Sequence, residues 1–388
     1  MELTNQAASP HPTWRLVAIT VLVVATSSQP AFLLGAAFFQ VGPEFGLGPV
    51  GQGALTAAFF LTAAATSTPL GRWVQRVGWQ RAMRVNTRSS AVLMLLISLG
   101  ARNLLLLIVL LVAAASLYGM SNPAANQALA DHTDPARQAT IFGMKHAGIP
   151  TSALLAGLLI PAVVVHWGWR WALGVVAVLT FLLSLTVPKS ELPAVPHSPE
   201  AAANRRPLPM RSLLALALGS AFATWSAISL STYLVTGALS VGFTAAGAGW
   251  LQFGGSAASI ATRVGVGILT DRRGSSGLGA LAGLVAAGAV VFALLPMTQG
   301  GLFALAVVAA FMTGWGWPGL MTFAVVQSDR AQAASSSAIT QAGVFVGAGV
   351  GPPVLGTIIE RSGYPASWYS VAAALAVAAV VVFRTGRR

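Results

Sequence analysis

The chain has 388 residues, of which 55% are hydrophobic and only 8% are charged. A soluble domain carries about 25% charged residues, so this composition excludes an ordinary soluble enzyme, and the apolar content excludes a disordered chain. The sequence contains no cysteine, which excludes a disulfide scaffold and a thiolate metal site. An integral membrane protein is the class that fits.

The net charge of +13 has an explanation that fits a membrane protein. In a soluble protein such a charge indicates nucleic-acid binding. In an inner-membrane protein, Lys and Arg instead collect in the cytoplasmic loops. We therefore expect a lipid bilayer as the environment and no nucleic-acid partner.

Hydrophobicity predicts about twelve membrane-spanning helices, since each needs about 20 apolar residues. The spans lie near residues 15–40, 50–70, 82–100, 103–127, 139–165, 168–187, 211–239, 243–267, 277–297, 301–327, 333–358 and 364–384. A polar, proline-rich stretch follows the sixth span and is typical of a linker. The predicted fold is an all-α polytopic membrane protein with an N-terminal six-helix bundle (1–187), a cytoplasmic linker (188–210) and a C-terminal six-helix bundle (211–388).

The positive charges predict the orientation. Arg102, Arg170 and Arg361 fall on one side of the predicted spans. The opposite side carries Arg15, Arg72, Arg76, Arg81, Arg84, Arg88, Arg137, Lys189, Arg205, Arg206, Arg211, Arg272, Arg273, Arg330, Arg384, Arg387 and Arg388. Both termini and the linker are therefore expected in the cytoplasm, and the localisation in a bacterial inner membrane as a multi-pass protein.

The two halves resemble each other at an offset of 195 or 196 residues. The matching pairs are Gly71 with Gly267, Pro123 with Pro318, Asp134 with Asp329, Gly148 with Gly343, and Gly168 with Gly363. A repeat of six spans preserves the topology, so the halves are expected to be related by an axis along the membrane normal. Such repeats place a substrate site at their interface near mid-membrane.

Two loops share a motif that identifies a family. The loop after the eighth span runs from Gly267 through Asp271 and Arg272 to Gly274, and it matches the pattern G-x-x-x-D-R-x-G. The loop after the second span matches with Gly71, Arg76 and Gly78 but carries Gln75 at the acidic position. Together with the repeat, these loops resemble the major facilitator superfamily over the whole chain. The resemblance implies a two-bundle secondary transporter that works by alternating access.

The motif residues are predicted to gate the cytoplasmic side. Glycines allow close helix contact, and a carboxylate such as Asp271 stabilises a neighbouring helix N-terminus. Asp134 with Arg137, and Asp329 with Arg330, are the expected partners in this latch. The alternative is that all of them are solvated loop charges. Because Gln75 is uncharged, we expect the latch of the first half to be the weaker one.

Two cations, Lys145 and Arg263, lie deep within predicted spans, whereas the middle of every predicted span lacks acidic residues. Lys145 follows Arg137 by eight residues and Arg263 precedes Asp271 by eight residues, which places each about 12 Å into the membrane. Two cations that face one cavity repel each other unless an anion bridges them. An anionic substrate is therefore the favoured prediction.

Arg263 also resembles a substrate-binding residue of two branches of the superfamily. In the oxalate/formate exchangers and the monocarboxylate transporters, an arginine four residues before the motif glycine binds the substrate carboxylate, and Arg263 stands four residues before Gly267. There are departures: Ser259 replaces the aspartate of the monocarboxylate family, and Thr340 and Gln341 stand where the second half would repeat Lys145 and His146. The segment 142–150 resembles bacterial cyanate-permease-like proteins.

Each of these residues also has a structural interpretation. Arg263 and Lys145 can extend toward the surface or bond to helix carbonyls. His146 is a candidate carrier of a coupled proton or a buried, hydrogen-bonded helix residue. Further candidates for the substrate cavity, or for packing within it, are Tyr118, Asn122, Gln341, Trp317 and Gln29.

The competing function is a proton-coupled efflux transporter for neutral or cationic drugs, in which case the two cations are structural. Such pumps usually hold an acidic residue inside a span, and this chain has none. An enzyme is not expected: no Gly-x-Ser-x-Gly elbow with a histidine partner is present, and the acidic and histidine residues near Asp131 face no second cluster. We predict no catalytic residues, metal or cofactor, and a monomer that binds a small-molecule substrate, with a proton or an exchanged solute as the coupled species.

Overall fold

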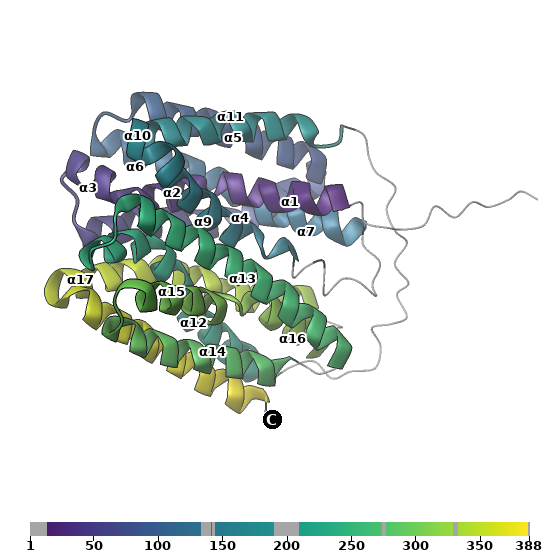
Figure 1. Cartoon of the computed structure of the whole chain (residues 1–388). Helices are drawn as coiled ribbons and strands as arrows, with labels where there is room; N and C mark the ends of the chain where they lie inside the picture. The colour runs from purple at the N-terminus through teal and green to yellow at the C-terminus, as the bar shows by residue number, and fades with distance from the viewer. Residues whose placement is uncertain are drawn as a thin grey trace, which may run out of the picture.

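The computed structural model describes residues 14–132, 141, 144–189, 209–273, 277–328 and 333–386, and the regular elements in these ranges are all helical. The helices run roughly side by side (Figure 1). Those of the N-terminal half, purple to teal, lie above those of the C-terminal half, green to yellow, in this view. The predicted all-α polytopic fold is confirmed.

The N-terminal half contains α1 (Trp14–Ser27), α2 (Gln29–Ala36), α3 (Phe38–Phe45), α4 (Pro49–Val77), α5 (Trp79–Gly100), α6 (Leu104–Tyr118), α7 (Ser121–Asp131), α9 (Gly148–Leu159), the π-helix η2 (Ile160–Val164), α10 (Val165–Trp167) and α11 (Trp169–Thr186). The C-terminal half contains α12 (Met210–Ser240), α13 (Ala245–Arg273), α14 (Leu278–Leu294), the 3₁₀ turn η4 (Leu295–Met297), α15 (Gly300–Trp315), α16 (Pro318–Ser328) and α17 (Ala333–Gly386). Residues 190–208 of the proposed linker lie outside the described residues, so the domain boundaries remain a prediction.

The described elements group into twelve helical segments of membrane-spanning length, which is the number that hydropathy predicts. Within the described ranges, eight stretches are long and apolar enough to cross a membrane, or nine if α1 and α2 form one span bent by 55°. The more polar helices α5 and α13, of 22 and 29 residues, add two further segments to these. The stretch α17 counts as two segments, because Gly363 interrupts the helix with a φ of 78°.

Several spans are interrupted at or near prolines, although the hydropathy pattern predicts continuous helices there. A proline lacks the N–H that bonds the carbonyl four residues earlier. Pro30 sits in the first turn of α2 just after the bend from α1, and Pro161 lies in the π-helix η2. Pro123 and Pro318 follow the breaks between α6 and α7 and between α15 and α16. These broken spans expose backbone carbonyls inside the protein.

The structure supports the internal repeat. Pro123 and Pro318, one repeat apart, mark equivalent breaks in the fourth and tenth spans. Gly168 and Gly363, also one repeat apart, both have positive φ, 90° and 78°, and each joins two helices. Glycine adopts this conformation without the steric penalty that a side chain brings. The equivalent backbone features show that the halves share one architecture.

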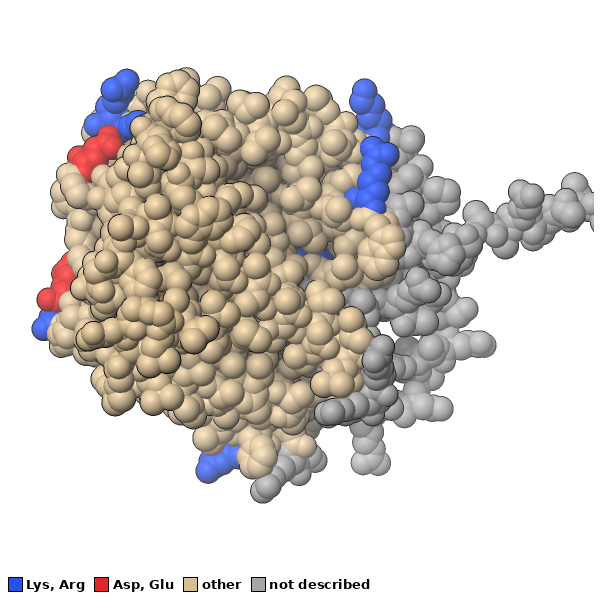
Figure 2. Space-filling model, viewed as in Figure 1, with Lys and Arg blue, Asp and Glu red and all other residues tan. Residues whose placement is uncertain are grey.

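The helices define two ends of the molecule. The terminal end is where Trp14, Thr186, Met210 and Gly386 lie, and the distal end is where the helix connections 46–48, 101–103, 241–244 and Gly363 lie. On the face drawn in Figure 2, charged side chains gather at these two ends and leave an uncharged belt between them. This distribution fits a bilayer around the belt.

The two halves make contact near the distal end. There α4 packs on α17 and α9 packs on α13, with glycines at both contacts. Toward the terminal end, the surface in Figure 2 is hollowed between the halves, and blue atoms of Lys or Arg are visible inside the hollow. The described structure is thus closed at its distal end.

Candidate functional site

Arg263 lies at the boundary between the halves. Only 4% of its surface is exposed. Its Nε and Nη2 donate to the Trp315 carbonyl at 3.0 and 2.6 Å, and its Nη1 donates to the His146 carbonyl of the other half. Trp315 is the last residue of α15, where carbonyls lack a partner within the helix. The break before Pro318 therefore supplies the acceptor that holds the guanidinium.

Lys145 lies one turn before α9, with 5% of its surface exposed. It has no hydrogen-bond or ion-pair partner among the described residues. Its neighbour His146 accepts a bond from Arg263 through its backbone oxygen. The two buried cations are therefore brought to the same region from opposite halves, as the sequence predicts.

His146 connects the halves through its side chain as well. Its Nε2 lies 3.1 Å from the hydroxyl of Thr322 on α16, at hydrogen-bond distance. Lys145 adjoins His146 in the sequence, and Arg263 bonds the His146 carbonyl, so both positive charges lie close to this residue. A proton on this imidazole would add a third positive charge, so its protonation and the arrival of an anion favour each other.

No acidic side chain of the described residues neutralises this cluster. The described carboxylates belong to Glu44, Asp131 and Glu360, all at helix ends. The hydrogen bonds that Arg263 makes go to neutral carbonyls. Within the part of the chain that the structure describes, the site is therefore a region of buried positive charge with no acidic partner, an arrangement that costs several kcal/mol.

A polar face of α13 continues from Arg263 toward the distal end. Gln252, Ser256 and Ser259 recur at helical spacing and are fully buried. The Gln252 amide donates to the Ala153 carbonyl at 3.4 Å. The predicted candidate Gln29 donates to the next carbonyl back, that of Ser152, at 2.9 Å. Sequence inspection missed Gln252 and Ser256, although their spacing with Arg263 was available as a signal.

Among the described residues, the other predicted cavity residues make no hydrogen bond to either cation. Tyr118 is buried against Phe59, with ring centroids 5.2 Å apart, and Asn122 is half-buried one turn further along the chain. Trp317 is buried at the break between α15 and α16. Gln341 is half-buried on α17. Their role in substrate binding stays a prediction.

The predicted gating residues are only partly described. Gly71 packs against Pro123 of α7: a Cβ added to Gly71 would stand 3.6 Å from the Pro123 ring. Gly78 turns the chain from α4 to α5 with a φ of 80°, Gly267 faces open space, and Arg76 is exposed. Asp134, Arg137, Gly274, Asp329 and Arg330 lie outside the described residues, as do the side chains of Asp271 and Arg272.

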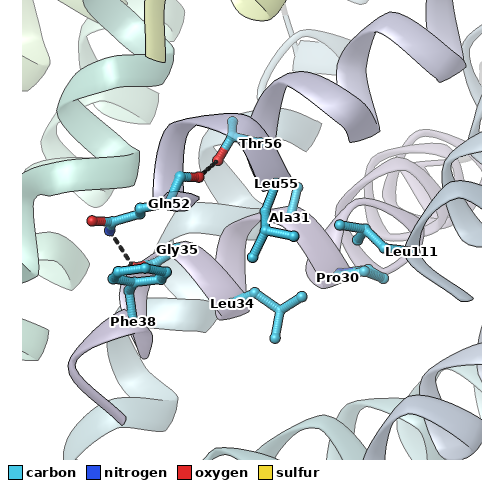
Figure 3. Close-up of a pocket in the computed structure, with 9 residues that line it drawn as sticks. All are labelled: Pro30, Ala31, Leu34, Gly35, Phe38, Gln52, Leu55, Thr56 and Leu111. Carbon is cyan, nitrogen blue, oxygen red and sulfur yellow. Dashed lines mark hydrogen bonds between the residues drawn. The ribbon is translucent and has the colours of Figure 1, made fainter. Parts of the chain in front are cut away.

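A small pocket lies elsewhere, within the N-terminal half (Figure 3). Its lining is mainly apolar and comprises Pro30, Ala31, Leu34, Gly35, Phe38, Gln52, Leu55, Thr56 and Leu111. Neither buried cation contributes to it. We therefore do not assign substrate binding to this pocket.

A charged cluster at the distal end was also missed. Arg170 forms an ion pair with Glu44, and the Trp169 indole donates to the same carboxylate at 2.8 Å. Desolvation opposes ionisation of Glu44, but the bonds from Arg170 and Trp169 outweigh it and lower the pKa of this carboxyl. Arg170 also lies 4.4 Å from the Trp169 ring centroid. This cluster ties the first span to the sixth.

Comparison with known proteins settles the family. The model of the Major Facilitator Superfamily matches residues 18–274. The chain belongs to the major facilitator superfamily. Members of this family are membrane transporters rather than enzymes, so the chain is a multi-pass membrane transporter. Among curated proteins, none matches this sequence.

Solved structures share the fold at low identity. A bacterial homolog to the human lysosomal transporter Spinster, in an inward-facing and occupied conformation, has a TM-score of 0.73 and 17% identity over 98% of each chain. FucP, a transporter of the superfamily in the outward conformation, has a TM-score of 0.65 and 17% identity over 96% of this chain and 98% of that chain. These likenesses establish the fold and leave the substrate open.

Proposed function

We propose that the protein is a secondary transporter of a small organic or inorganic anion, such as a carboxylate, which binds between Lys145 and Arg263. The observation that carries the proposal is the burial of two cations from opposite halves with no carboxylate among their described neighbours. An anion between them would replace their repulsion by two attractive contacts.

The position of the cations suits alternating access. Each half supplies one cation, so a bound anion bridges the halves and stabilises the state in which they meet. Arg263 already bonds the His146 carbonyl across the interface. A planar guanidinium binds a carboxylate with two parallel hydrogen bonds, which would compete with its present carbonyl partners.

Coupling to a proton is part of the proposal. His146 lies beside both cations and bonds to Thr322 of the other half. A bound anion offsets the cost of protonating the imidazole, so anion and proton would be carried in the same direction. If His146 stays neutral throughout, exchange of one anion for another is the remaining mode.

We also propose a bacterial inner membrane as the location, with the terminal end in the cytoplasm and the monomer as the working unit. The support for this orientation is that most Lys and Arg residues fall on the side of the predicted spans where both termini lie. Cytoplasmic reactivity of cysteines introduced at Arg211 or Arg384 would test the orientation.

A binding screen tests the anion proposal. Purified protein would be heated with small carboxylates, other anions, neutral solutes and cationic drugs, alongside Arg263→Gln and Lys145→Gln. Arg384→Gln serves as the matched control, because it removes one positive charge from an exposed site at the terminal end. A ligand at about 100 times its Kd stabilises the folded state by roughly 2.7 kcal/mol.

The expected result is stabilisation by anions in the wild type and in the control, and none in the two buried-site variants. Stabilisation of all four proteins by cationic or neutral compounds alone would contradict the proposal. That outcome would instead support the drug-efflux alternative, with Lys145 and Arg263 as structural residues.

A further inference from the structure

One face of α13 carries a line of polar side chains that ends at Arg263. Gln252, Ser256 and Ser259 precede the arginine at successive intervals of 4, 3 and 4 residues. At 3.6 residues per turn, the four positions fall within about 60° of one another around the helix. All four side chains are buried. The line runs about 16 Å along the helix axis, from the arginine toward the distal end.

This face of α13 lies against α9 of the other half. At its distal end, the Gln252 amide donates to the Ala153 carbonyl at 3.4 Å. At its other end, Arg263 donates to the His146 carbonyl, just before α9. The two serines lie on the same face between these contacts, so they are directed at the interface between the halves.

Gln29 of α2 brings a further polar group to this interface. Its amide nitrogen donates to the Ser152 carbonyl of α9 at 2.9 Å. One turn later on α2, Phe32 stacks on Trp315 with ring centroids 6.1 Å apart, and the Trp315 carbonyl accepts two bonds from Arg263. The helices α2, α9 and α13 therefore converge on one polar region beside the arginine.

Four buried side-chain atoms of this polar region have no hydrogen-bond partner in the described part of the chain. They are the Oε1 atoms of Gln29 and Gln252 and the hydroxyls of Ser256 and Ser259. By contrast, Thr262 on the same helix bonds to the carbonyl four residues earlier at 2.9 Å, as hydroxyls in helices commonly do. Buried polar atoms without partners destabilise a protein, so a ligand that supplies the missing bonds relieves that cost.

The unbonded atoms restrict the chemistry of such a ligand. The side-chain oxygen of glutamine only accepts hydrogen bonds, so the ligand has to offer a donor. An ammonium donor would be repelled by Lys145 and Arg263, and the described carboxylates all lie at helix ends, away from these cations. A hydroxyl is uncharged, donates to an amide oxygen, and both donates to and accepts from a serine. Hydroxyl groups therefore fit the polar region best.

We propose that the anion is a hydroxycarboxylate, whose carboxylate binds between Lys145 and Arg263 and whose hydroxyls bond the polar region. The inference rests on the proposed function, because the two cations hold the carboxylate. The line of polar groups on α13 sets the orientation: the hydroxylated carbons extend from Arg263 toward Gln252. An alkyl chain in this place would leave the buried oxygens unbonded, and a site built to bond hydroxyls rejects an analogue that lacks them.

Matched pairs of carboxylates test the inference. Calorimetry would measure the Kd of glycerate against propionate and of gluconate against hexanoate, since the members of each pair have carbon chains of equal length. The proteins are wild type, Arg263→Gln, Ser256→Ala, Ser259→Ala and the matched control Ser184→Ala. The control removes an equally buried and unbonded hydroxyl from α11. Because no described group bonds these hydroxyls, the serine variants should fold as the wild type does.

In at least one pair, the hydroxylated member should bind the wild type about ten- to a hundredfold more tightly than its alkyl partner. Ser256→Ala or Ser259→Ala should weaken binding of that hydroxylated member about fivefold, the equivalent of one hydrogen bond, and leave the alkyl partner unaffected. A purely structural role of the serines would change both members alike. The control should bind as the wild type does.

Two kinds of failure can be told apart. Equal affinity within each pair, with binding lost in Arg263→Gln, overturns the hydroxycarboxylate inference and leaves the proposed function standing. The same holds if neither serine variant weakens binding, or if the control weakens it equally. If none of the four carboxylates binds, or if their binding survives Arg263→Gln unchanged, the inference and the proposed carboxylate site both fall.

Discussion

Replacing the two buried cations by methionine should have opposite effects on the empty protein. Lys145 has no hydrogen-bond or ion-pair partner among the described residues, so Lys145→Met removes a desolvated charge and its repulsion with Arg263. Replacing buried charges by apolar groups of similar size stabilises by about 1–4 kcal/mol in favourable cases. We expect a gain of about 1–2 kcal/mol, at the low end because the lysine chain adapts toward water.

Arg263→Met should destabilise the same protein. It leaves the carbonyls of Trp315 and His146 without the donors that they now have. A buried acceptor that loses its partner costs about 1–3 kcal/mol. The relief of charge repulsion offsets part of this, so we expect a net loss of about 1–2 kcal/mol.

The assay is the unfolding temperature of each variant in one detergent, with no anion beyond chloride. Because the unfolding entropy grows with chain length to about 0.8 kcal/mol/K for 388 residues, 1 kcal/mol shifts the unfolding temperature by about 1 °C. Lys145→Met should therefore melt about 1–2 °C higher and Arg263→Met about 1–2 °C lower. A fall for Lys145→Met as large as that for Arg263→Met would refute the reasoning, because it would mean that Lys145 has a stabilising partner.

Two further predictions concern local structure. Gly168→Ala should destabilise the protein by about 1–3 kcal/mol, because residues with a side chain rarely adopt the φ of 90° found at Gly168. Gly267 is a helical glycine that faces open space, so Gly267→Ala should be neutral or stabilise the protein by up to about 1 kcal/mol. Equal melting temperatures for the two variants would contradict this prediction. The lowered pKa of Glu44 means that its contribution is present above the ordinary pKa of 4.5 and is lost as pH falls through the lower folded value. Glu44→Gln should therefore cost less than about 1 kcal/mol near neutral pH, because the pair is exposed, and should remove that acid-dependent loss; a cost that persists unchanged below that range would argue against the ion pair.

The sequence predicts the number of spans because the thickness of the bilayer fixes the length of each apolar stretch, so the stretches can be counted along the chain. It does not predict the breaks in them. The bend between α1 and α2 and the π-helix at Pro161 each depend on which carbonyls find a substitute donor, and that requires neighbouring helices. The repeat was the exception: the offset of Pro123 and Pro318 predicted equivalent positions, and the structure places equivalent breaks there.

The site was predicted as a charge pattern and not as a geometry. The depth of Lys145 and Arg263 followed from helical rise, and both are buried between the halves. The sequence could not indicate that Arg263 bonds the carbonyls of Trp315 and His146, because backbone acceptors have no residue signature. For the same reason, the partners of Gln252 on α9 and of Gln52 on α12 became visible only in the structure.

The most direct test of the account is a double-mutant cycle on anion affinity. Calorimetry would measure the Kd of the best anion from the screen for wild type, Lys145→Met, Arg263→Lys and the double variant. If both cations hold one anion, each single change weakens binding at least about tenfold, and the double variant loses less than the sum, with a coupling of about 1 kcal/mol or more. Unchanged affinity in either single variant, or strictly additive losses, would contradict a shared anion site.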